Sequence, residues 1–175
     1  MPTVTTQIDE LPLTRTPTAP LAGFAGLYER HYETVYRAAL RVTGNPADAE
    51  DVLQTVFLRI LARGGDVEDV ALPVAYFRRA AVNAAVDVLR RRALHAESAY
   101  DEQAPQVAVQ PPVLLKERLR RAIAVLDGDD ATLFLLRHVE GLSIEELAGI
   151  FSIEKNNVTV KLHRIRLRLQ ATMER

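Results

Sequence analysis

The chain has 175 residues, of which 48% are apolar and 26% charged, and its net charge of −1 is ordinary for a soluble globular protein of one or two small domains. The absence of cysteine excludes disulfides, thiolate metal sites and cysteine nucleophiles. No apolar run is long enough to span a membrane and no signal pattern opens the chain, so we expect a cytoplasmic protein.

The small net charge hides two basic segments. Residues 76–92 carry five arginines and one acid, and residues 153–170 carry five lysines or arginines and one acid. Residues 21–72 are acidic instead, with eight acids against five arginines. This alternation indicates two contacts with a polyanion and a different partner for the acidic face, although ordinary solvated helices would give the same charges.

The periodicity predicts an all-α fold in two parts. Residues 1–20 contain four prolines and many threonines, which is typical of a disordered tail. Helical patterns fill residues 21–95 and 113–175. Residues 96–112 between them are polar, proline-containing and aperiodic, as expected of a flexible linker. We therefore predict two small helical domains joined by a linker.

An acidic helix is predicted from the stretch GNPADAEDVLQTVFLRILARG. Asn45 can cap it and Pro46 suits its first position. One side carries the apolar residues Val52, Leu53, Val56, Phe57 and Ile60. The opposite side carries Asp48, Asp51, Gln54, Thr55 and Leu58. An exposed leucine among acids and amides favours a docking surface for a basic partner, although single surface leucines are common.

The stretch PVAYFRRAAVNAAVDVLRRRA predicts a helix of opposite charge. Its apolar side comprises Val74, Phe77, Ala81, Ala84, Ala85 and Val88. The other side carries a stripe of Tyr76, Arg79, Asn83, Asp87 and Arg90. An aromatic ring, cations and hydrogen-bonding side chains on one stripe favour unpaired nucleic acid, and a solvent face with a salt bridge is the alternative.

The C-terminal stretch predicts a helix-turn-helix. Ser143 and Glu146 form a capping-box pattern before a short helix, and a turn at residues 151–153 precedes a long basic helix. The late alternation IRLRLQ resembles a strand, but the spacing of Val158, Leu162, Ile165 and Leu169 is helical. The side chains expected to face outward are Asn156, Thr159, Val160, His163 and Arg164. Such side chains can read bases in the major groove, and a helical hairpin with a basic outer face remains the alternative.

These three segments, in this order, resemble the extracytoplasmic-function sigma factors of bacterial RNA polymerase, over roughly residues 26–169. The resemblance implies that residues 21–95 form sigma region 2 and residues 113–175 form sigma region 4. It implies core-polymerase binding by Asp48, Asp51, Gln54, Thr55 and Leu58. It implies binding of the −10 DNA by Tyr76, Arg78, Arg79, Asn83, Asp87, Arg90, Arg91 and Arg92. It implies binding of the −35 DNA by Lys155, Asn156, Asn157, Thr159, Val160, Lys161, His163 and Arg164.

The sequence also departs from the family pattern. Tyr76 stands where the family usually has tryptophan, Ser152 where it has a turn glycine, and Glu154 where it has a serine cap. The resemblance further implies promoter DNA, core polymerase and an anti-sigma protein as partners.

Two other functional classes were considered. A two-domain helix-turn-helix regulator would bind duplex DNA without polymerase, but it leaves the acidic helix and the arginine stripe without a role. The four histidines show no metal-ligand spacing and no glycine-rich phosphate loop is present, so we expect no enzyme, metal, cofactor or small-molecule substrate.

Overall fold

The computed structural model describes residues 19–62, 74–98 and 111–174, and all the secondary structure in these ranges is helical. Most of the predicted tail and linker lies outside the described residues, while α1 extends slightly into the predicted tail and α3 and α4 into the predicted linker. The helices are α1 (Ala19–Thr43), α2 (Pro46–Ala62), α3 (Val74–Ser98), α4 (Pro111–Ala124), α5 (Gly128–His138), α6 (Ile144–Phe151) and α7 (Lys155–Met173).

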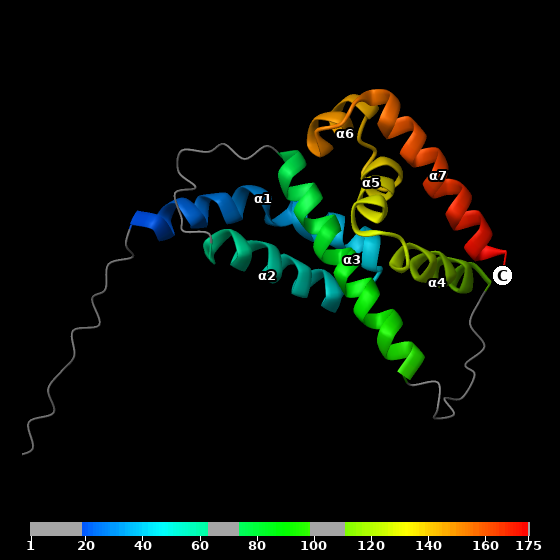
Figure 1. The fold of residues 1–175 in the computed structure, drawn as a ribbon. Helices are drawn as coiled ribbons and strands as arrows, with labels where there is room; N and C mark the ends of the chain where they lie inside the picture. The colour runs from blue at the N-terminus through cyan, green and yellow to red at the C-terminus, as the bar shows by residue number, and fades with distance from the viewer. Residues whose placement is uncertain (1–18, 63–73, 99–110, 175) are drawn as a thin grey trace, which may run out of the picture.

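The turn between α1 and α2 is set by its sequence. Gly44 has a φ of 66°, a left-handed conformation that suits glycine, and its N–H donates to the Leu40 carbonyl at 2.8 Å. Asn45 then caps α2 as predicted, since its side-chain oxygen accepts from the N–H groups of Ala47 at 2.9 Å and Asp48 at 3.2 Å. The chain reverses direction here, so α1 and α2 lie side by side (Figure 1).

α3 packs across this pair and completes the N-terminal half (Figure 1). The apolar sides predicted for α2 and α3 are confirmed in most positions: Phe77, Ala81, Val52 and Val56 are all at most 2% exposed. The prediction for Val74 was wrong, because this residue is 46% exposed. Val74 is the first residue of α3.

The C-terminal half contains the predicted helix-turn-helix. The capping box is present, with the Ser143 N–H donating to Glu146 at 2.7 Å and the Glu146 N–H donating to Ser143 at 3.1 Å. Ser152 ends α6 with φ 53° and ψ 44°, in the left-handed region, and α7 follows. The helical period of α7 is confirmed, because its buried residues are Val158, Leu162, Ile165 and Leu169.

The two halves pack against each other along α3, which contacts α4, α5 and α6 (Figure 1). Val86, on the side of α3 away from its predicted apolar residues, is 1% exposed. It belongs to one continuous core that also includes Leu126 and Leu133 of the C-terminal half. α3 is therefore buried on two sides, one against each half.

Within the described ranges, we find no helix with the length and hydropathy that a membrane crossing requires.

Candidate nucleic-acid interface

The predicted stripe on α3 lies against the C-terminal half. The Arg79 guanidinium donates to the Ile150 carbonyl at 2.6 Å and lies 4.6 Å from the centre of the Phe151 ring. Arg90 donates to the carbonyls of Leu126 at 2.8 Å and Ala124 at 3.3 Å. Both arginines therefore contact backbone carbonyls in the C-terminal half, near the end of α6 for Arg79 and at or just after the end of α4 for Arg90.

The polar side chains of the stripe are also engaged. The Thr132 hydroxyl on α5 lies 2.5 Å from the side-chain oxygen of Asn83, to which it donates. Asp87 stays within its own half, 3.8 Å from Arg90 and 3.9 Å from Arg59. In this arrangement three members of the stripe, Arg79, Asn83 and Arg90, are therefore bonded to the C-terminal half.

A small groove between α2 and α3 brings part of the stripe together. It has a volume of about 240 Å³ and is lined by Tyr76, Arg79 and Asn83 from α3, with Arg59 and Ile60 from α2. The Tyr76 ring makes an edge contact with Phe77 at 5.6 Å between centroids, which fixes the ring beside the groove. An aromatic ring, a guanidinium and an amide therefore line one recess, as a base-binding site requires.

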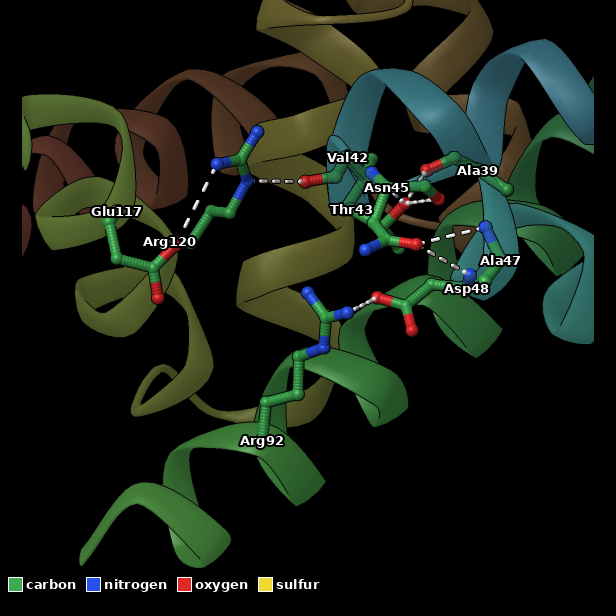
Figure 2. A network of polar contacts seen from close by, with 9 residues as sticks. All are labelled: Ala39, Val42, Thr43, Asn45, Ala47, Asp48, Arg92, Glu117 and Arg120. Atoms are coloured by element: carbon green, nitrogen blue, oxygen red, sulfur yellow. Dashed lines mark hydrogen bonds and ion pairs between the residues drawn. The ribbon is translucent and has the colours of Figure 1, made fainter. Parts of the chain in front are cut away.

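The basic end of α3 has a different environment. Arg91 is exposed, whereas Arg92 makes an ion pair with Asp48 of α2 at 2.6 Å (Figure 2). Asp48 retains only 15% of its side-chain exposure. The structure thus joins one residue expected to bind DNA to one expected to bind polymerase.

The remaining α2 residues expected to bind polymerase form an open ridge. Asp51, Gln54 and Leu58 are exposed, and Leu58 reaches 63%. Thr55 is half-buried beside them. The ridge therefore has an apolar centre with an acid and an amide near it.

The outer face of α7 is uncovered in the described part of the chain. All eight residues expected to bind the −35 DNA are exposed: Lys155, Asn156, Asn157, Thr159, Val160, Lys161, His163 and Arg164. Two of the cations have partners within the C-terminal half, since Lys155 lies 2.8 Å from Glu145 and Lys161 lies 3.3 Å from Asp130. The hydrogen bond from Lys155 holds the pKa of Glu145 below its ordinary value.

Two of the three departures from the family pattern, Ser152 and Glu154, lie just before α7. Glu154 takes the cap position but makes no side-chain cap hydrogen bond, and the turn is made by a serine with positive φ. Glu146, by contrast, accepts from the Ser143 backbone, and this hydrogen bond lowers the pKa of Glu146. The short helix of the motif is therefore capped more completely than the long one.

Periodicity did not reveal three residues that link the halves. Arg41 and Glu140 form a two-point ion pair at 2.8 Å and 2.9 Å. Arg120 of α4 donates to the Val42 carbonyl at the end of α1 at 3.2 Å (Figure 2). Glu140 lies in a turn between helices, so no repeat of apolar positions singles it out.

No group of three or more acidic, histidine or cysteine side chains suited to a metal ion occurs among the described residues.

Comparisons with known proteins agree with this layout. The family described as sigma-70 region 2 matches residues 27–95, and sigma-70 region 4 matches residues 116–169. The chain is 31% identical over 147 residues to an RNA polymerase sigma-E factor of Streptomyces avermitilis, covering 81% of this chain and 80% of that protein. It is 30% identical over 145 residues to the RNA polymerase sigma factor CarQ of Myxococcus xanthus, covering 81% of this chain and 83% of that one.

A further relative is the ECF RNA polymerase sigma factor SigE of Mycolicibacterium smegmatis, 27% identical over 87% of this chain and 62% of that protein. The two family regions cover the two helical halves in the order that the sequence predicted. The chain therefore belongs to the extracytoplasmic-function sigma factors of the sigma-70 family.

Proposed function

We propose that this sigma factor acts as a non-catalytic, cytoplasmic specificity subunit whose three helices α2, α3 and α7 have separate tasks. The exposed ridge of α2 docks on core RNA polymerase. The α3 stripe holds the unpaired −10 strand, and the outer face of α7 enters the major groove at the −35 element. The observation that carries the proposal is that Asp51, Gln54 and Leu58 of α2 and all eight predicted residues of α7 are exposed, on two helices far apart in the sequence.

The chemistry of each face suits its task. Arg164 can donate two hydrogen bonds to guanine and Val160 can contact a thymine methyl group, each pairing contributing about 1–3 kcal/mol of discrimination. In the α3 groove, the Tyr76 ring offers a stacking surface worth about 1–3 kcal/mol per base, which offsets much of the cost of unstacking. Promoter melting would follow from trapping bases as they open.

The domain boundaries and an inhibitory partner belong to the same proposal. Residues 21–95 would act as sigma region 2 and residues 113–175 as region 4, with residues 96–112 connecting them. We also propose an anti-sigma protein as a partner, because the resemblance to the family implies one.

The polymerase assignment can be tested with Asp51→Arg. Charge reversal at the exposed acid of the α2 ridge should abolish binding to core polymerase, while circular dichroism stays unchanged because Asp51 is exposed. Binding is measured by co-purification with core enzyme and by run-off transcription on a random promoter library.

Glu50→Arg is the matched control. It makes the same charge change at an exposed neighbour on α2 that lies off the ridge, and it should bind polymerase normally. Retained binding by Asp51→Arg would remove α2 from the docking assignment.

A further inference from the structure

Two arginines of the N-terminal half converge on one carboxylate of the C-terminal half. The Nε and Nη2 atoms of Arg41 lie 2.8 Å and 2.9 Å from the two carboxylate oxygens of Glu140. The Nε atom of Arg78 lies 3.8 Å from one of the same oxygens. The Glu140 side chain is only 1% exposed, while the side chains of Arg41 and Arg78 remain 49% and 38% exposed.

This geometry is that of an anion site. A planar guanidinium that donates two parallel hydrogen bonds recognises a carboxylate or a phosphate in the same way. A buried carboxylate is costly unless it is paired, so Glu140 depends on the two arginines more than they depend on it. The arginines, half open to solvent, could exchange this partner for another anion.

Side chains of the α3 stripe are also bonded to the C-terminal half. Arg79 and Arg90 of the DNA-binding stripe donate to backbone carbonyls of the C-terminal half, and Asn83 accepts from Thr132. Backbone acceptors and one hydroxyl donor of the C-terminal half thus occupy the positions that the stripe would offer to phosphates and base edges. Arg41 lies on α1, outside every residue set that the sequence predicted.

We propose that Arg41 and Arg78 form a phosphate-binding pair for unpaired DNA, and that Glu140 occupies this pair as an internal competitor when the two halves are closed. The inference rests on the proposed DNA-binding role of α3 and adds Arg41 to that surface. Binding of a single strand requires the Glu140 turn to leave the pair, so the closed chain binds such a strand weakly.

The test measures how tightly the full chain binds a short fluorescein-labelled single-stranded DNA of mixed sequence, by anisotropy over a series of salt concentrations. Glu140→Gln removes the competing charge at nearly constant shape and should tighten binding about tenfold, because a hydrogen-bonded charge is lost from the closed form. Asp129→Asn is the matched control, since it removes the same charge from an exposed position on α5 and should bind as the unmodified chain does.

The double variant Arg41→Gln with Glu140→Gln isolates the phosphate contact. It should bind more weakly than Glu140→Gln alone, and the slope of log affinity against log salt should be smaller by about 0.7, the value for one lost phosphate contact on a single strand. If the double variant matches Glu140→Gln in affinity and slope, Arg41 contacts no phosphate and the pair is refuted. If Glu140→Gln behaves as Asp129→Asn does, Glu140 is not a competitor.

A folding failure would not end the test. Circular dichroism checks each variant, and if Glu140→Gln does not fold, Arg41→Gln alone should still show the smaller salt slope, while an unchanged slope overturns the pair. Run-off transcription by the unmodified chain with core polymerase tests the sigma function independently. Transcription without these changes in strand binding would leave that function in place and refute only the phosphate pair.

Discussion

α3 and α7 are both long basic helices, yet α3 is buried on two sides whereas α7 is buried on one. The polar side of α7 is exposed along its length, from Asn156 to Arg164. The polar side of α3 contacts three helices of the other half, and Arg79 and Arg90 are bonded there. A polar helix face can therefore meet solvent or another part of the same chain, and charge alone does not distinguish the two.

The difference in exposure between α3 and α7 bears on the proposed function. In the proposed function, the exposed face of α7 would meet duplex DNA as it stands, whereas α3 would first have to lose its contacts with α4, α5 and α6. The two proposed DNA contacts would then form under different conditions.

The largest effect is expected for Arg164→Ala on the open helix. Loss of a base contact should reduce initiation at promoters that carry a −35 element, because one such contact contributes about 1–3 kcal/mol of discrimination between bases. The measurement is run-off transcription with saturating core polymerase. Arg121→Ala, an exposed arginine of α4 outside the proposed DNA surface, should leave initiation unchanged. Equal losses in the two variants would take Arg164 off the reading face.

The same deletion on the two helices should have unequal effects on stability. Val86 on α3 is 1% exposed, and Val86→Ala removes its two methyl groups. The free energy of unfolding should therefore fall by about 2 kcal/mol. Val160→Ala on α7 affects a residue that is 47% exposed and should stay within about 0.5 kcal/mol. Urea unfolding of the full chain measures both. Similar values would show that the C-terminal half does not cover α3 in solution.

A smaller effect is expected at the turn that sets α7 against α6. Ser152 holds a left-handed conformation with φ 53°, so Ser152→Gly should stabilise the chain by about 0.5–1 kcal/mol. Gly141 allows the opposite substitution to be tested, because it has a φ of 73° and no atom lies within 4 Å of the position that a Cβ would take. Gly141→Ser should lower the melting temperature where Ser152→Gly raises it, and shifts of the same sign would contradict the backbone assignment.

Much of the fold could be predicted because its signals are local. The Asn45 cap, the capping box from Ser143 to Glu146 and the four buried positions of α7 each follow from residues within a few turns of one another. The same holds for the outward positions of α7, which the helical period alone assigns. Short-range spacing is sufficient wherever one helix face meets one core.

The arrangement of the two halves could not be predicted in this way. Glu140 meets Arg41, 99 positions away in the chain, and Asn83 meets Thr132 across 49 positions. No periodic pattern in the sequence predicts either contact. Val74 was misassigned for a related reason, because a helical wheel shows the direction of a side chain but not which other helices lie beside it.

The residue-level site assignments stay predictions. Asp48 illustrates the difficulty, since a wheel placed it on the outer side of α2 and the structure gives it an ion pair with Arg92. A partner from another helix can satisfy a charge that looks available from its own helix.

The bare backbone at Gly44 has a wider consequence. A methyl group placed there would lie 1.9 Å from a nitrogen of the Arg120 guanidinium, which rests against this turn. The Arg120 guanidinium would therefore have to shift, and its hydrogen bond to the Val42 carbonyl would be disturbed. One added carbon at the turn between α1 and α2 would in this way reach a side chain of α4 without altering a single charge.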